Sequence, residues 1–259
     1  MKETVVLEAI NEEKIVLPIS YNHIVQGMIY ENLDKELSNF LHNEGFQKDK
    51  RIYKMFTFSR LIGLYFLDRE NGKIIFSNPI KLIISSPYAE FNNSIGSKLL
   101  TSEVINLGNN YVRVTEIKVT QEQVEGEEIE IATLSPVVVY STLYKVTGEK
   151  FTYYYNPYEK EFSEIISNNL KNKYKAFYLK NPPEGDVKIR PITKTRLSVI
   201  KYKDFVMKGY SGRFIMTGPK ELLELGLSTG LGNKNSQGFG CRPGISTNES
   251  RGILTIFID

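Results

Sequence analysis

The chain has 259 residues, of which 41% are hydrophobic, 24% charged and 12% aromatic, and it contains no tryptophan. This composition is typical of a globular protein and excludes a disordered or collagen-like chain. The formal net charge is only +3, so a partner that recognises charge must respond to its distribution along the chain. The single cysteine, Cys241, excludes an internal disulfide. We find no signal peptide and no apolar run of the ~18 residues that span a membrane, so we expect a cytoplasmic protein.

The first 120 residues follow the order β-α-β-β-α-β. Residues 4–10 are rich in β-branched side chains and predict a strand, and residues 24–33 carry apolar side chains at helical spacing. Residues 55–67 and 73–86 predict two strands joined by a tight turn at Asn71 and Gly72, which readily adopt positive φ. A helix is expected within residues 88–107, and a strand at residues 111–119.

The second half repeats this order after an exposed connection at residues 121–130, which hold five Glu and no apolar periodicity. We expect strands at 129–140 and 142–155, a helix at 157–174, and a long hairpin at 187–202 and 205–216 that turns at Lys203 and Asp204. A short helix after Pro219 and a last strand at 253–258 follow. The sequence therefore predicts an α+β protein of two tandem ferredoxin-like (RRM-like) domains, a duplicated β-α-β-β-α-β unit, at residues 1–122 and 129–259.

The long hairpin is strongly basic. Residues 187–216 contain eight basic side chains and one acidic side chain, Asp204. Such a surface suits a polyanion such as RNA, although Lys and Arg also decorate strands that bind nothing. The candidate RNA-binding residues of this hairpin are Lys188, Arg190, Lys194, Arg196 and Lys201.

A glycine-rich segment at residues 230–240 consists of two Gly-X-Gly units that bracket five polar residues. Glycine lets a partner approach the main chain closely, and the polar insert offers amide, hydroxyl and ammonium donors to a phosphate backbone. The spacing fits neither a Rossmann nor a Walker phosphate-binding loop, and a purely structural turn is the alternative. The candidate RNA-binding residues of this segment are Gly230, Gly232, Lys234, Asn235, Ser236, Gly238 and Gly240.

This glycine motif, together with an initial strand and the segment Leu17-Pro18-Ile19-Ser20-Tyr21-Asn22, resembles the sixth family of CRISPR-associated (Cas) proteins. These are endoribonucleases of the repeat-associated mysterious protein (RAMP) superfamily, and the resemblance spans nearly the whole chain. It implies two ferredoxin-like domains and metal-independent cleavage of precursor CRISPR RNA within its repeats, without a cofactor. It also implies CRISPR repeat RNA as a partner and leaves association with a CRISPR effector complex, or a homodimer, open.

The resemblance places the catalytic residues of the family on Tyr30, His42 and Lys54, with Lys48 and Lys50 as alternatives for the lysine. Their chemistry suits attack by the RNA 2′-hydroxyl on the phosphate, which leaves 2′,3′-cyclic phosphate and 5′-hydroxyl ends. A histidine, with an ordinary pKa of about 6.5, can accept or donate a proton near neutrality. A lysine can neutralise the charge of the phosphorane, and a tyrosine can donate a hydrogen bond. Which of the tyrosine and the histidine is the acid or the base stays open.

Two further expectations concern the histidines. His23, near the start of the first helix, is interpreted as a capping or surface residue, and one Cys with two His offers no ordinary zinc site.

The alternative function is a non-cleaving RNA-binding subunit of a CRISPR effector complex, which would not need His42.

Tyr30 and His42 cannot share a phosphate if one helix carries both. Twelve residues of unbroken helix would separate them by ~18 Å along the axis. We therefore predict a break at residues 32–34, with Asp34 capping a second short helix that ends before Gly45 at a left-handed position.

Overall fold

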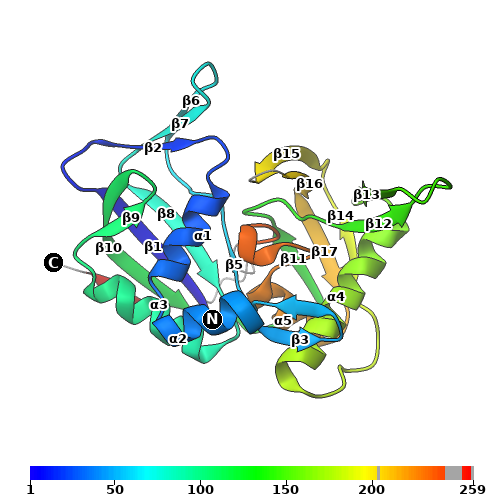
Figure 1. Ribbon diagram of the computed structural model, residues 1–259. Helices are drawn as coiled ribbons and strands as arrows, with labels where there is room; N and C mark the ends of the chain where they lie inside the picture. Colours follow the sequence, from blue (N-terminus) through cyan, green and yellow to red (C-terminus); the bar gives the residue numbers. More distant parts are fainter. Residues whose placement is uncertain (203–204, 243–252, 258–259) are drawn as a thin grey trace.

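The computed structural model describes residues 1–202, 205–242 and 253–257. Its elements gather in two lobes, one built mainly by the first 120 residues and the other by the residues that follow (Figure 1). The elements of the first lobe are β1 (Lys2–Ala9), β2 (Lys14–Pro18), α1 (Asn22–Glu31), α2 (Lys35–Asn39), the π-helical turn η1 (Phe40–Glu44), β3 (Phe46–Lys48), β4 (Arg51–Tyr53), β5 (Thr57–Phe58), β6 (Tyr65–Asp68), β7 (Lys73–Ser77), β8 (Ile80–Ser85), α3 (Ala89–Thr101), β9 (Ile105–Leu107) and β10 (Asn110–Thr120).

The main sheet of the first lobe has the antiparallel order β10-β1-β8-β5, with β9 paired to β10. Along the chain its elements follow the predicted order β1-α1-β5-β8-α3-β10. The apolar stripe of α1 contributes Val25 and Ile29 to the core, and α3 contributes Phe91 and Ile95. These helices cover one face of the sheet because their buried positions recur every three or four residues.

The two strands expected at residues 55–67 and 73–86 are each divided in the structure. β5 and β8 belong to the main sheet, whereas β6 and β7 form a separate sheet with β2 and project as a hairpin (Figure 1). The predicted turn at Asn71 and Gly72 does join β6 to β7. Pro79 lies between β7 and β8, where its missing N–H interrupts the ladder. A continuous apolar pattern did not reveal that the chain changes sheets here.

The second lobe contains β11 (Glu128–Ala132), β12 (Tyr140–Tyr144), β13 (Lys150–Tyr154), α4 (Lys160–Tyr178), β14 (Lys188–Pro191), β15 (Arg196–Tyr202), β16 (Phe205–Ser211), β17 (Arg213–Thr217), α5 (Lys220–Thr229) and the 3₁₀ turn η2 (Asn235–Gln237). Its sheet has the order β11-β17-β14, and α4 and α5 share a core with it. Phe162 of α4 stacks on Phe214 of β17, with ring centroids 6.5 Å apart. No helix in the described part of the chain is long and apolar enough to cross a membrane.

The predicted basic hairpin is present but bends out of this sheet. β14 pairs with β17 inside the sheet, and beyond residue 195 the same two segments continue as the separate pair β15–β16. The expected turn at Lys203 and Asp204 falls outside the described residues.

The last strand, β18 (Ile253–Phe257), pairs antiparallel with β10 at the edge of the first sheet. The boundary expected from sequence had assigned these residues to the second domain, 129–259. Within the described residues, the second lobe thus repeats the order β-α-β-β-α through β11, α4, β14, β17 and α5, and its sheet has three strands. The local sequence indicates that residues 253–257 form a strand. Which of the two sheets this strand joins depends on long-range pairing, which the local sequence does not indicate.

Candidate functional site

The chain turns back between Tyr30 and His42, as predicted. α1 ends at Glu31, α2 begins after Asp34, and His42 lies in the π-helical turn η1. The rings of Tyr30 and His42 meet edge to face with centroids 6.1 Å apart. Asp34 occupies the N-cap position, but its side chain makes no capping hydrogen bond. Its main-chain N–H instead donates to Ser94 Oγ at 2.7 Å, which fixes the bend against α3.

Gly45 ends the π-helical turn with a φ of 59°, at the position expected from sequence. Its N–H donates to the carbonyl of Phe40 at 2.7 Å. A Cβ at this position would lie 2.8 Å from the carbonyl oxygen of Tyr53. Only glycine combines this conformation with such close packing, and the tight turn that results points His42 back toward α1.

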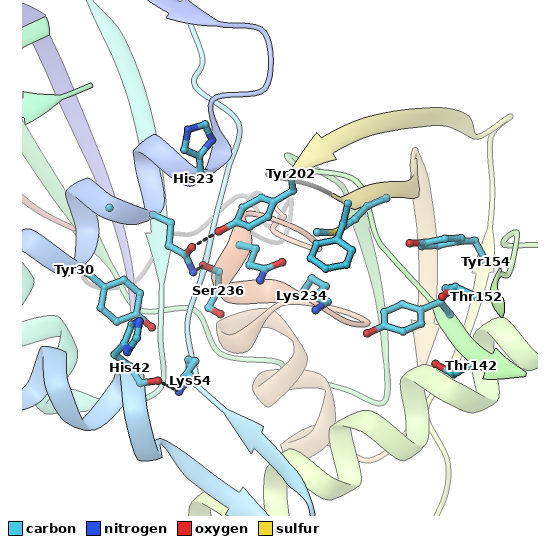
Figure 2. Close-up of a pocket in the computed structure, with 16 residues that line it drawn as sticks. His23, Tyr30, His42, Lys54, Thr142, Thr152, Tyr154, Tyr202, Lys234 and Ser236 are labelled. Atoms are coloured by element: carbon cyan, nitrogen blue, oxygen red, sulfur yellow. Dashed lines mark hydrogen bonds between the residues drawn. The ribbon is translucent and has the colours of Figure 1, made fainter. Parts of the chain in front are cut away.

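Tyr30, His42 and Lys54 line one cleft of about 830 Å³ (Figure 2). The Nζ of Lys54 donates a hydrogen bond of 2.8 Å to the main-chain carbonyl of His42. Of the two alternative lysines, Lys48 forms an ion pair with Asp49 at 3.0 Å and does not line this cleft, and Lys50 lines only an adjoining one. The structure therefore brings Lys54 together with the tyrosine and the histidine.

Burial shifts the pKa values of Tyr30 and Lys54 in opposite directions. It raises the pKa of Tyr30 well above the ordinary range, with a smaller contribution from the nearby Tyr202, so the Tyr30 hydroxyl keeps its proton. Burial also lowers the pKa of Lys54. The Nδ1 of His42 lies 2.9 Å from Asn43 Oδ1, and with Nδ1 as the donor the lone pair is on Nε2. Tyr30 is therefore suited to donate a hydrogen bond, and His42 can take up a proton.

The second lobe supplies the opposite wall of the cleft, most of which sequence reasoning missed. The lining residues from this lobe are Tyr140, Thr142, Thr152, Tyr154, Tyr202, Phe205, Met207, Lys234, Ser236 and Gln237. His23 is exposed and also lines the cleft, with its ring 6.4 Å from that of Tyr202 and perpendicular to it (Figure 2). His23 is thus a surface residue as expected, but no side-chain hydrogen bond caps α1. The aromatic residues near the basic hairpin were the sequence feature that could have indicated this wall.

The glycine-rich segment lies between the two lobes and is largely buried. Gly230, Gly232, Gly238 and Gly240 are buried, each at positive φ. A Cβ on Gly232 would lie 2.4 Å from the carbonyl oxygen of Val138. These glycines therefore let main-chain segments pack tightly, and they do not present an open surface to a ligand.

Side chains of the first lobe bind the main chain of this segment directly. Asn22 Nδ2 donates to the carbonyl of Gln237 at 2.9 Å, Gln26 Nε2 to that of Ser236 at 2.7 Å, and Thr57 Oγ1 to that of Phe239 at 3.1 Å. Lys234 is exposed, and Ser236 is half-buried. Both line the cleft, so these two side chains are the part of the motif that a ligand can reach.

Lys173, a fully buried lysine of α4, anchors the same segment from the other side. Its Nζ donates to Thr229 Oγ1 at 3.1 Å, to the carbonyl of Gly230 at 2.8 Å and to Asn235 Oδ1 at 2.7 Å. Asn235 Nδ2 in turn donates to the carbonyls of Leu231 and Phe239. The Asn235 amide is thus occupied by internal hydrogen bonds, and burial lowers the pKa of Lys173 to about 7.

A second cleft of about 900 Å³ adjoins the first and shares Lys54, Lys234 and Ser236 with it. It adds the exposed side chains of Lys50, an alternative for the catalytic lysine, and of Arg51, which sequence reasoning had not assigned to RNA. The described residues that line the two clefts include no Asp or Glu, so the groove is positively charged without internal compensation. Among the described residues, no three His, Cys, Asp or Glu side chains lie together so that they could hold a metal ion.

The five basic residues predicted on the hairpin lie outside both clefts. Lys188, Arg190, Lys194, Arg196 and Lys201 are all exposed, on β14, β15 and the link between them. The same hairpin carries Tyr202, Phe205 and Met207 into the cleft. The basic strands therefore continue outward from the cleft wall.

Comparison with known proteins finds similar proteins over most of the chain. Residues 118–242 match the family described as "CRISPR associated protein Cas6, C-terminal". "CRISPR-associated endoribonuclease Cas6 1" of Methanocaldococcus jannaschii is 28% identical over 90% of this chain and 89% of its own length. "CRISPR-associated endoribonuclease Cas6" of Pyrococcus furiosus is 28% identical over 86% of this chain and 82% of its own length. A solved structure of a "CRISPR associated protein Cas6" has a TM-score of 0.76 and 26% identity and covers 95% of this chain and 99% of that one.

Proposed function

We propose that the chain is a member of the Cas6 family and an endoribonuclease that cleaves precursor CRISPR RNA within its repeats, because residues 118–242 match that family and Cas6 endoribonucleases are similar to most of the chain. The observation that carries this proposal is the meeting of Tyr30, His42 and Lys54 in one cleft, beside Lys234 and Ser236 of the other lobe. These residues supply a proton acceptor, a hydrogen-bond donor and cations. Cleavage of RNA by its own 2′-hydroxyl uses these groups, together with a proton for the leaving 5′-oxygen.

In the proposed reaction, the Nε2 of His42 takes the proton of the 2′-hydroxyl as the 2′-oxygen attacks the adjacent phosphorus. The P–O5′ bond breaks, and the 5′-oxygen takes up a proton from water, so that the products carry a 2′,3′-cyclic phosphate and a 5′-hydroxyl. Tyr30, which keeps its proton because burial raises its pKa, donates a hydrogen bond to a phosphorane oxygen. Lys54 and Lys234 neutralise the charge that develops on that group.

The groove between the lobes is the proposed path of the RNA. Its cations attract the phosphate backbone, and the aromatic side chains on its second wall offer stacking surfaces to unpaired bases. The exposed basic residues of β14 and β15 would extend the contact with the backbone beyond the cleft. In this proposal Lys234 and Ser236 touch the RNA, while the buried glycines and Asn235 hold their loop in shape.

The experiment that tests this function uses repeat RNA labelled at its 5′ end, with and without excess EDTA. We expect cutting at one position in both conditions, and no cutting when the scissile nucleotide carries a 2′-deoxyribose. His42→Ala should lower the cleavage rate at least ~10²-fold while the protein still binds the RNA.

The control is His23→Ala, which removes the other histidine of the cleft and should retain most of the activity. Cleavage of the 2′-deoxy substrate, or a requirement for Mg²⁺, would contradict the mechanism. A wild-type protein that binds the repeat and never cuts it would instead be a non-cleaving RNA-binding subunit of an effector complex.

A further inference from the structure

One face of α1 forms a wall of the catalytic cleft. His23, Gln26, Gly27 and Tyr30 all line the cleft, and their spacing of three, four and seven residues places them on the same side of the helix. Gly27 lies in the middle of this face, one turn before Tyr30. It is thus a residue without a side chain at the centre of a wall that otherwise carries large polar ones.

Neither backbone conformation nor packing explains a glycine at this position. Gly27 lies inside the regular helix Asn22–Glu31, and a Cβ built on it would meet no atom within 4 Å. Gly226 in α5 differs, because a Cβ there would lie 3.1 Å from Leu231. A helix with an interior glycine is less stable than one with an alanine at the same position, since glycine loses more backbone freedom on folding. Glycine at position 27 therefore lowers the stability of the helix, and neither its conformation nor its packing in the folded chain offsets this loss.

The helix is held at a fixed distance from the opposite wall at this level. Gln26 Nε2 donates to the carbonyl of Ser236 at 2.7 Å, and the Tyr202 hydroxyl donates to Gln26 Oε1. Across the cleft stand the aromatic rings of Phe205 and Tyr154, and the Phe205 side chain is 70% exposed. The cleft that Gly27 lines therefore has the main chain of α1 uncovered at this position and aromatic side chains elsewhere in its lining.

We propose that this space is a nucleobase subsite, in which the base of a nucleotide that flanks the scissile phosphate lies against the main chain of α1 at Gly27. A base is flat and aromatic, so it can approach a helix where Cβ is missing and stack on rings from the other side. Gly27 lies three residues, ~4.5 Å along the axis, from Tyr30, within reach of a base attached to the reacting phosphate. This inference rests on the proposed function, because it uses the RNA as the ligand.

Side chains added at position 27 test the subsite. Gly27→Ala should raise the melting temperature, because alanine favours the helix, and should still weaken cleavage of repeat RNA ~10-fold or more. Gly27→Leu should lower cleavage ~10²-fold, because it displaces the base and with it the reacting phosphate. The matched control is Gly96→Ala in the middle of α3, where the new Cβ would make only an ordinary contact of 3.9 Å with Glu3 Oε1. It should leave cleavage unchanged.

A change in the RNA provides the decisive measurement. If the leucine occupies the place of a base, removing that base should restore cleavage. We therefore expect Gly27→Leu to cut a repeat with an abasic site on one side of the scissile phosphate faster than the intact repeat, whereas the wild type cuts the abasic repeat more slowly. Rescue by an abasic site on either side supports the subsite and identifies the nucleotide.

The outcomes separate this inference from the proposed function. If the wild type cuts the repeat and Gly27→Leu cuts it equally well, or if neither abasic repeat is rescued, the subsite is wrong and the endoribonuclease function stands. An equal loss in Gly96→Ala would assign the effect to the fold and would also overturn the subsite. If the wild type binds the repeat without cutting it, the affinities of the same variants for the intact and abasic repeats test the subsite. Gly27→Leu should then bind an abasic repeat more tightly than the intact repeat, whereas the wild type should bind the abasic repeat more weakly.

Discussion

The Lys54 ammonium donates a hydrogen bond to the main-chain carbonyl of His42, with Nζ and O 2.8 Å apart. This bond connects the link between β4 and β5 to the π-helical turn that carries the histidine. Met55, the next residue, has a φ of 56°, an uncommon conformation for a residue with a side chain. An uncommon main-chain conformation at Met55 and a direct hydrogen bond therefore hold the Lys54 ammonium beside His42. The two residues, which were placed separately from the sequence, form one structural unit.

Lys54→Ala should reduce the rate of cleavage by up to ~10²-fold, and by less than His42→Ala does. The reason is that the variant loses both the charge opposite the phosphorane and the bond that positions His42. Single-turnover rates with saturating repeat RNA measure the effect without a contribution from binding. Lys48→Ala is the control, because Lys48 pairs with Asp49 outside the catalytic cleft. Equal rates for the Lys54 and Lys48 variants would remove Lys54 from the site.

Neutralising the basic hairpin should weaken RNA binding and reduce its dependence on salt. With Arg190, Lys194 and Arg196 all changed to Gln, the slope of log Kd against log salt concentration should fall by about 0.7 for each lost phosphate contact. Titrations of fluorescent repeat RNA at several salt concentrations provide this slope. The control changes three exposed lysines of β2, β7 and β8, Lys14, Lys73 and Lys81, to Gln. A slope that changes equally in both triple variants would place the RNA elsewhere.

Lys173→Met should change how stability depends on pH. Burial lowers the pKa of Lys173 to about 7 in the folded protein, whereas an unfolded chain keeps the ordinary value of about 10.4. Between these values the unfolded chain binds more protons, so this lysine makes the folded state more stable as pH rises. Urea unfolding at pH 7 and pH 9 should therefore show a gain in the wild type that the variant lacks. Parallel changes in both proteins would contradict the lowered pKa.

The same variant should also loosen the segment at residues 230–240 that we propose binds RNA. Without the ammonium, the buried carbonyl of Gly230 and the Oδ1 of Asn235 lose a donor, which costs about 1–3 kcal/mol for each unsatisfied group. Lys234 and Ser236 then lie on a loosened segment. Affinity for repeat RNA should fall in Lys173→Met, although this lysine is too buried to touch the RNA.

Glu3→Gln should stabilise the protein at pH 8. Glu3 is buried in β1, its Oε2 has no hydrogen-bond partner among the described residues, and burial raises the pKa of this carboxyl to about 7. The folded state therefore holds its proton between about pH 4.5 and 7 while the unfolded chain has lost it, so the stabilising contribution disappears as pH rises through this range. The glutamine is neutral throughout. We expect the free energy of unfolding of the variant to exceed that of the wild type by roughly 3 kcal/mol at pH 8 and to equal it near pH 4.5.

Thermal or urea unfolding across this range measures the Glu3 difference. Glu8→Gln, on the same strand, is the control, because the Glu8 carboxylate already has an arginine partner, Arg113, at 3.3 Å. A constant difference between Glu3→Gln and the wild type at all pH values would mean that the effect comes from packing.

The sequence alone predicted most of the larger helices and strands and the bend between Tyr30 and His42. Helical and strand periods, the Asn71-Gly72 turn and the glycine at position 45 are local features, and the structure shows each of them. The family resemblance implied that Tyr30 and His42 share a site, and chain geometry then required a break between them, because an unbroken helix would keep them apart.

Only the tertiary structure decided which surfaces form the groove. The glycine motif indicated a close approach to the main chain, but the partner that approaches is the protein itself, through bonds such as Asn22 Nδ2 to the carbonyl of Gln237, 215 residues away in the chain. The aromatic wall at Tyr202 and the edge that β18 joins depend in the same way on contacts between distant segments. Such contacts are selected by the total burial and hydrogen bonding of the folded chain, and no local pattern of residues records them.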